Sequence, residues 1–120
     1  RIDPDWVGTP EVLGDGRARA TLRTTPAMAA DDQGLVHGGF VFGTADLAAM
    51  VAVNDPNVVL GAATVRFTAP VRVGETVVAE ARVVAADGKK RQIEVDAKVG
   101  DRQVLAGTLT AFVLDHHVLG

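Results

Sequence analysis

The sequence predicts an α+β fold in which one long central helix is wrapped by a curved antiparallel sheet of about five strands. Residues 39–54 are rich in Ala, contain no Pro and are apolar nearly all round, which indicates a buried helix. Four later strand-like segments are joined largely by tight turns, which pair neighbouring strands antiparallel. With 120 residues, of which 48% are hydrophobic and 22% charged, we expect one packed domain spanning 1–120.

The first part of the chain alternates between irregular and extended segments. Residues 1–16 are broken by Pro and Gly and are expected to form an irregular lead-in, with a short helical turn near Trp6. Residues 17–25 alternate apolar and polar side chains, which predicts a half-buried strand. Pro26 ends this strand, and residues 27–36 are expected to form a loop.

The helix and the strands after it have clear boundaries in the sequence. Asn54 to Pro56 should end the helix. Asp87-Gly88 and Gly100-Asp101 are turn signals, and the first is a strong hairpin signal. After the helix we predict four strands, at residues 58–69, 75–86, 90–99 and 103–114.

Composition excludes several classes of protein. The net charge is −3, and the chain has one Trp and no Tyr, which argues against nucleic-acid binding. The absence of cysteine excludes disulfides, thiolate metal sites and a Cys nucleophile, and it fits the cytoplasm. The apolar run from Gly38 to Val53 contains Asp46 and is shorter than the ~20 residues of a membrane span, so no membrane partner is expected.

Asp46 is the most informative residue of the sequence. It is the only ionisable group between His37 and Asp55, and it lies too deep in the helix to act as a cap. A buried carboxylate is costly unless it is paired, so Asp46 either serves function, or faces a water-filled interface, or is satisfied by a hydroxyl such as that of Thr44. The pattern alone leaves these interpretations open.

His37, Gly38 and Gly39 precede the helix. Two glycines let a ligand approach the backbone, and the free N–H groups of a first helical turn attract an anion or a polarised carbonyl. An oxyanion hole uses this arrangement, although Gly pairs are also common in ordinary turns into helices.

The spacing of Gly39 and Asp46 predicts a dimer. Seven residues separate them, so they share a helix face but lie about 10 Å apart along its axis. Two helices packed antiparallel across a two-fold axis would place Gly39 of one subunit near Asp46 of the other, in two identical sites. We therefore expect a homodimer, with a homotetramer as an alternative that the sequence does not decide.

The stretch GLVHGGFVFGTADLAAMVAVN, residues 34–54, resembles the signature of hotdog-fold acyl-CoA thioesterases, especially the phenylacetyl-CoA thioesterase-like (PaaI-type) branch. Residues 65–84 are similar to the next two strands of that family. The resemblance implies a hotdog fold and hydrolysis of an acyl-CoA thioester to a free acid and coenzyme A, without metal or bound cofactor. It also implies that Gly39 N–H polarises the carbonyl, that His37 helps to shape the hole, and that Asp46 of the partner subunit activates water or attacks directly.

Further substrate contacts are expected from residues near this motif, namely Gly38, Asp31, Phe40, Thr44 and Arg66. Asp31 is a departure, because many relatives carry Asn six residues before the His. The alternative function is a non-catalytic acyl-CoA-binding hotdog domain, a ligand sensor or scaffold. A hotdog hydratase or dehydratase ranks last, since the helix lead-in shows no convincing Asp/His pair of that type. Neighbouring strand residues point to opposite faces, so His116 and His117 are expected to be structural rather than metal ligands.

Overall fold

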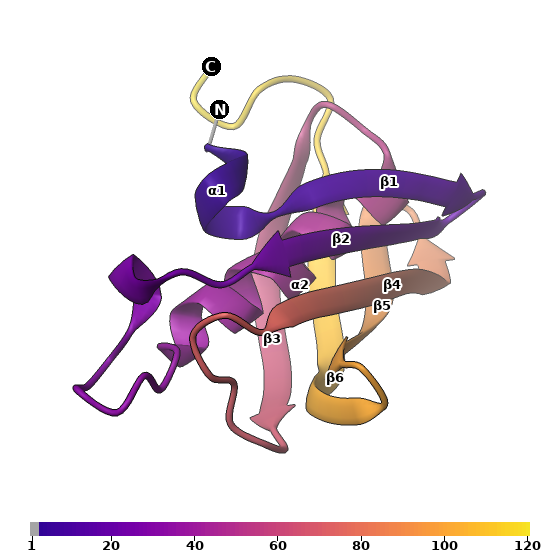
Figure 1. Cartoon of the computed structure of the whole chain (residues 1–120). Coiled ribbons are helices and arrows are strands. Elements are labelled where there is room, and N and C mark those ends of the chain that lie inside the picture. Colours follow the sequence, from indigo (N-terminus) through magenta and orange to yellow (C-terminus); the bar gives the residue numbers. More distant parts are fainter. Residues whose placement is uncertain (1–2) are drawn as a thin grey trace.

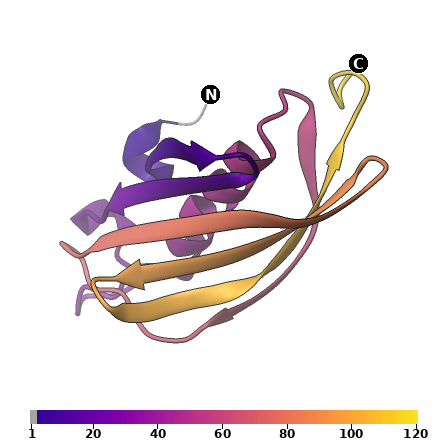
Figure 2. The same ribbon diagram turned by 90° about the vertical axis from the view of Figure 1, so that its right-hand side faces the viewer.

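The computed structural model describes residues 3–120, and in it the long helix α2 (Gly38–Val53) lies against one six-stranded antiparallel sheet (Figure 1). The spatial order of the strands is β1-β2-β4-β5-β6-β3. Their bounds are β1 Thr9–Gly14, β2 Arg17–Arg23, β3 Val58–Phe67, β4 Thr76–Asp87, β5 Lys90–Val99 and β6 Arg102–Val113. Figure 2 shows the sheet curving around the helix, as the sequence predicts.

Small side chains on both surfaces let the helix approach the sheet closely. Ala20, Ala79 and Ala97 form one cross-strand row through β2, β4 and β5, and all three are fully buried. The helix side of the same core is also dominated by alanine, and its buried residues are Val41, Thr44, Ala45, Ala48, Ala49 and Ala52. Close approach of this kind gives dense packing without large side chains.

The number of strands is a correction to the prediction, because residues 9–14 belong to a strand and not to an irregular lead-in. β1 is an edge strand paired with β2, and nearly all of it is exposed, so it lacks the buried alternation that marks a strand in sequence. Pro10 is tolerated there because an edge position needs no ladder donor. Gly8 precedes the strand at φ 100°, where a Cβ would lie 2.6 Å from the Thr21 carbonyl oxygen. The helical turn predicted near Trp6 is confirmed as α1 (Pro4–Val7).

The remaining elements are found within two residues of their predicted ends. Asn54 ends α2 in the left-handed conformation, with φ 57° and ψ 48°, which Asn adopts more readily than most residues. Gly88 and Gly100 both take φ 59° in the turns that join β4 to β5 and β5 to β6. The loop at 27–36 overlaps a 3₁₀ turn at Pro26–Met28. No helix of residues 3–120 has the length and apolar character needed to cross a membrane.

Candidate functional site

The helix α2 has two sides with different surroundings. Its buried residues recur every three or four positions and face the sheet. Gly39, Gly43, Asp46 and Met50 follow the same spacing on the opposite side, and none of them is fully buried. Gly43 lies beside α1, where a Cβ would come 3.7 Å from the Val7 side chain. The outward side therefore carries both residues of the predicted chemistry on an otherwise apolar surface.

Asp46 is the one ionisable residue of α2, and nothing in the described chain satisfies all of its carboxylate. The side chain is partly buried, and Oδ1 is buried without a hydrogen-bond partner among residues 3–120. Burial raises the pKa of Asp46 above the ordinary aspartate value. The hydroxyl of Thr44 donates instead to the Phe40 carbonyl, at 3.1 Å. The hypothesis that the Thr44 hydroxyl satisfies Asp46 is therefore wrong, and Asp46 Oδ1 accepts no hydrogen bond from residues 3–120.

His37 caps the helix by accepting, at Nδ1, the Gly39 N–H that the prediction assigned to the substrate. Gly39 N–H donates to His37 Nδ1 at 2.9 Å, and Phe40 N–H donates to the His37 carbonyl at 3.1 Å. In the part of the chain that the structure describes, the N–H of Gly38 has no acceptor. A carbonyl that binds at Gly39 must therefore displace His37 Nδ1, which the sequence did not reveal.

A groove of about 370 Å³ opens at the N-terminus of α2, beside Gly38. The end of β3, the β3–β4 loop (residues 68–75) and the segment before α2 form its walls, and no charged side chain lines it. The Phe67 ring comes within 3.1 Å of where a Cβ on Gly38 would lie, so glycine permits this close approach. The larger apolar side chains of the groove are Leu35, Val36, Val41, Phe67, Val71 and Val104.

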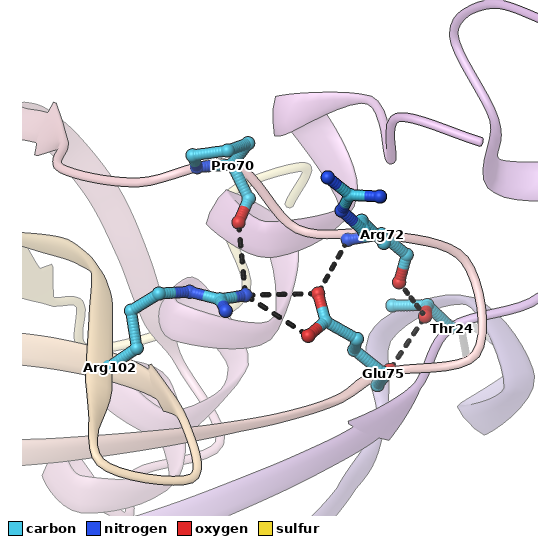
Figure 3. A network of polar contacts seen from close by, with 5 residues as sticks. All are labelled: Thr24, Pro70, Arg72, Glu75 and Arg102. Atoms are coloured by element: carbon cyan, nitrogen blue, oxygen red, sulfur yellow. Dashed lines mark hydrogen bonds and ion pairs between the residues drawn. The ribbon is translucent and has the colours of Figure 1, made fainter. Parts of the chain in front are cut away.

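A polar network holds the β3–β4 loop (Figure 3). Glu75 accepts a hydrogen bond from Arg72 N–H at 2.7 Å, and its two oxygens accept from Arg102 Nη2 at 3.0 and 3.1 Å. The same guanidinium nitrogen lies 3.2 Å from the Pro70 carbonyl oxygen. Thr24 Oγ1 lies 3.1 and 2.6 Å from the carbonyl oxygens of Arg72 and Glu75. The network thus joins the loop to residues at the ends of β2 and β6.

The network also sets the charge state of Glu75. The hydrogen bond from Arg72 N–H lowers the pKa of Glu75 below the ordinary glutamate value, against the opposing effect of burial, and Arg102 adds to the lowering. The carboxylate is therefore held ionised while it is bonded on both oxygens. This is the behaviour expected of a structural carboxylate.

The β3–β4 loop in turn holds the segment that leads into α2. Val36 N–H donates to the Val71 carbonyl at 2.8 Å, and Val73 N–H donates to the Gly34 carbonyl at 2.8 Å. His37 N–H donates to a carbonyl on the other side, that of Met28, at 2.9 Å. The turn at the start of α2 and the wall of the groove are consequently positioned by one connected set of bonds.

The family described as the thioesterase superfamily matches residues 33–106, which is more than half of the chain and includes α2, the β3–β4 loop and most of the sheet. The chain belongs to the thioesterase superfamily. A crystal structure of an uncharacterised protein, PH1136 from Pyrococcus horikoshii, is 47% identical with a TM-score of 0.96, over 98% of this chain and 91% of that one.

The hotdog fold of this thioesterase-superfamily chain is shared with more distant structures. The E. coli PaaI protein from the phenylacetic acid degradation operon is 21% identical with a TM-score of 0.77, over 90% of this chain and 81% of that one. At that identity the likeness concerns the fold alone. The prediction of a hotdog fold is therefore confirmed.

Two curated relatives are considerably longer than this superfamily member. Methylthioribose-1-phosphate isomerase of Aquifex aeolicus is 44% identical over 115 residues, which cover 95% of this chain and 25% of that protein. Transcription factor FapR of Bacillus subtilis is 31% identical over 84 residues, which cover 68% of this chain and 45% of that protein. The chain thus spans a quarter to about half the length of these relatives.

The predicted substrate contacts of this superfamily chain fall in different places. Phe40 stacks on Trp6 with ring centroids 5.8 Å apart. Asp31 is exposed, and its Oδ1 accepts from the N–H groups of Gln33 and Leu35, which gives it a role in its own loop. Arg66 is exposed on the edge strand β3 and makes no ion pair within residues 3–120.

Thr44 is the predicted contact that the structure does not support. Its side chain is fully buried on the sheet side of α2, and its hydroxyl bonds within the helix. Thr44 is therefore a core residue. Its hydroxyl can be buried because a Thr in a helix can donate to the carbonyl four residues earlier.

Sequence reasoning missed Phe67, Glu75 and Arg102. Phe67 and Val65 are two positions apart in the strand predicted at 58–69 and so share one apolar face, yet the Phe67 side chain is 55% exposed at the groove. A signal was available in part, since an aromatic residue at the end of a strand is followed by the turn-forming residues Thr-Ala-Pro. Glu75 and Arg102 are 27 residues apart, and no local pattern pairs them.

Proposed function

We propose that this chain hydrolyses an acyl-CoA thioester to a free acid and coenzyme A, with Asp46 as the catalytic carboxylate. One observation carries the proposal, namely that Asp46 is the only ionisable group on the outward side of α2 and keeps a buried, unbonded oxygen there. A carboxylate in that state is a strong base for its type and has no structural partner. Membership of the thioesterase superfamily supports the same reaction class.

The proposed site is shared between two subunits. Gly39 and Asp46 lie on one side of α2 but about 10 Å apart along it, at 1.5 Å per residue. A second copy packed antiparallel on this apolar side would bring its Asp46 to the Gly39 of the first. The edge strand β3 supports association as well, because it is ten residues long and carries the exposed Leu60.

The chemistry at such a site needs few groups. The thioester carbonyl accepts a hydrogen bond from Gly39 N–H once His37 Nδ1 has given it up, and the N–H of Gly38 lies one residue away. As a general base, Asp46 removes a proton from water, the hydroxide adds to the carbonyl carbon, the C–S bond breaks, and the thiolate takes up the proton. As a nucleophile, Asp46 attacks the carbonyl carbon and the C–S bond breaks, which leaves a mixed anhydride on Asp46 and releases the coenzyme A thiolate. Water then hydrolyses the anhydride to the free acid and ionised Asp46, and the thiolate takes up the proton that this step releases. Neither route uses a metal or a bound cofactor.

Release of free thiol from a panel of short, long and aryl acyl-CoAs tests the proposal. The wild type should release thiol from part of the panel, and Asp46→Asn should lose on the order of a hundredfold in kcat/KM, as expected when a general base is removed. Asp101→Asn is the matched control, since this exposed aspartate lies in the β5–β6 turn. Equal activity of wild type and Asp46→Asn would overturn the proposed role of Asp46.

A second candidate is a non-catalytic domain that binds acyl-CoA. Two observations favour it, namely the engagement of Gly39 N–H by His37 Nδ1 and the likeness to a protein named as a transcription factor. The two candidates differ in one measurable respect. A binding domain retains acyl-CoA in equilibrium dialysis and releases no thiol from it.

A further inference from the structure

The groove beside Gly38 adjoins the backbone turn at which the proposed reaction would hold a thioester carbonyl. A carbonyl carbon bonded to the turn at His37–Gly39 has two substituents, the thiol part and the acyl part. The groove is adjacent to the turn and can take up one of the two. The lining of the groove therefore indicates which of them it suits.

The volume and the polarity of the groove favour the acyl part. At about 370 Å³ it lies near the lower end of the ~300–1,000 Å³ typical of ligand pockets, so it suits only one portion of an acyl-CoA. Thr68 brings the one side-chain hydroxyl of the lining, and that hydroxyl already donates to the Gln103 carbonyl at 2.9 Å. The amide-bearing arm of coenzyme A would lose hydrogen bonds there, whereas a hydrocarbon would lose none.

We infer that this groove binds the acyl group, that the preferred substrates are thioesters of uncharged, apolar acids, and that Phe67 sets the size limit. This inference rests on the proposed function. No charged side chain lines the groove, so a second carboxylate on the acyl group would be buried without a partner. Acyl groups of dicarboxylic acids should therefore be poor substrates.

Phe67 is suited to limit size because its ring forms part of the wall without being packed in the core. The side chain is 55% exposed at the end of β3, and its ring atoms lie 3.1 to 3.6 Å from the Cβ position on Gly38. Truncation to Ala removes that part of the wall and lengthens the groove toward solvent. The opposite change is available at Ala69, a partly buried neighbour in the lining, where a larger side chain would fill space.

The test compares acyl-chain profiles. For wild type, Phe67→Ala and Ala69→Leu, kcat/KM is measured with acetyl-, butyryl-, hexanoyl-, octanoyl-, phenylacetyl- and succinyl-CoA. Phe67→Ala should raise the octanoyl-to-butyryl ratio by about tenfold or more, and Ala69→Leu should lower it, since hydrophobic pockets discriminate by such factors per methylene. Succinyl-CoA should be the poorest of the longer substrates for all three proteins.

Controls separate a local effect from a general one. Phe112→Ala truncates a Phe that is 37% exposed on β6 and lies against Gly61 rather than Gly38, so its profile should equal that of wild type. Phe67→Leu provides a milder second variant, and its ratio should lie between those of wild type and Phe67→Ala. An unchanged ratio in both Phe67 variants overturns the inference even if every protein is active.

Binding distinguishes failure of this inference from failure of the proposed function. Dissociation constants for the same thioesters are measured with Asp46→Asn, alone and combined with Phe67→Ala. If no protein releases thiol but the second change shifts binding toward octanoyl-CoA, the hydrolase proposal falls and the acyl groove stands. If thiol is released but the octanoyl-to-butyryl ratio is the same in the Phe67 and Ala69 variants as in wild type, the groove assignment is wrong and the hydrolase proposal stands.

Discussion

Two partly buried carboxylates, Glu75 and Asp46, are held in opposite ways. Glu75 has a hydrogen bond on each oxygen, from a backbone N–H and from Arg102, and these bonds lower its pKa. Asp46 has an oxygen that is buried with no partner among residues 3–120, and burial raises its pKa. The difference shows that partial burial alone does not mark a functional acid.

What distinguishes the two residues is the neighbourhood. Glu75 lies where a loop exposes backbone donors and where an Arg reaches across from β6, so ionisation strengthens the fold. Asp46 lies on an apolar helix face between Gly43 and Met50, where ionisation brings no compensating contact within one chain. A residue kept in the second situation is more readily explained by chemistry than by stability, which is the basis of the proposed function.

The largest expected effect is a loss of activity without a loss of stability when Asp46 is replaced. Asp46→Asn should lower thiol release on the order of a hundredfold and leave the free energy of unfolding unchanged or slightly increased, because it removes a desolvated charge. Urea unfolding of wild type and variant measures the second quantity. A loss of stability comparable to the loss of a structural ion pair would show that the Asp46 carboxylate has a stabilising partner, as Glu75 does.

Glu75 should show the reverse behaviour in stability. Glu75→Ala should lower the free energy of unfolding by about 1–2 kcal/mol, because Arg72 N–H and Arg102 lose their shared acceptor. The matched control is Glu94→Ala, which breaks the exposed 2.8 Å ion pair with Arg82 on the sheet surface and should cost less. Amide exchange at Val36 and Val73 should accelerate in the first variant and stay unchanged in the second.

The pH dependence of stability should separate the two carboxylates by sign. For Asp46, the folded pKa is raised, so its stabilising effect is complete below about 3.9, the unfolded value, and is lost as pH rises through the folded pKa. For Glu75, the folded pKa is lowered, so its effect is complete above about 4.3 and is lost as pH falls through the folded pKa. Unfolding of Asp46→Asn and Glu75→Gln, each relative to wild type across mildly acidic pH, should give opposite slopes.

The same raised pKa has a kinetic consequence. If ionised Asp46 is the catalytic group, kcat/KM should rise with pH through a pKa above the ordinary aspartate value. A pH–rate profile on the preferred thioester measures this. An acid limb at the ordinary aspartate value, about 3.9, would show that Asp46 is not desolvated in the working enzyme.

The smallest expected effects come from removing the hydroxyl of Thr24 or that of Thr44. Thr24→Val removes the Oγ1 that contacts two carbonyls of the Glu75 loop and should cost about 1 kcal/mol, the usual value for such a bond. Thr44→Val removes a bond within α2 and should cost less, because the Phe40 carbonyl keeps its helical acceptor role. Thermal unfolding of both variants measures the two losses of stability. Equal losses would show that the Thr24 hydroxyl stabilises the protein no more than a hydroxyl bonded within a helix does.

The elements that could be predicted from the sequence are those whose signals are local. Apolar composition predicts α2, strand-like patterns between turn signals predict five of the strands, and Gly88 and Gly100 mark two turns. Asp46 also stands out locally, as the one charge within an apolar helix. Each of these signals depends on residues within a few positions of one another.

Features that depend on partners far apart in the sequence became visible once the chain was folded. β1 becomes a strand because β2 offers it an edge, and Glu75 finds Arg102 across 27 residues. The capture of Gly39 N–H by His37 Nδ1 depends on a side-chain rotamer, and the exposure of Phe67 depends on where the β3–β4 loop lies. Periodicity in a sequence reports which side chains are buried, whereas the identity of a partner is set by the path of the whole chain.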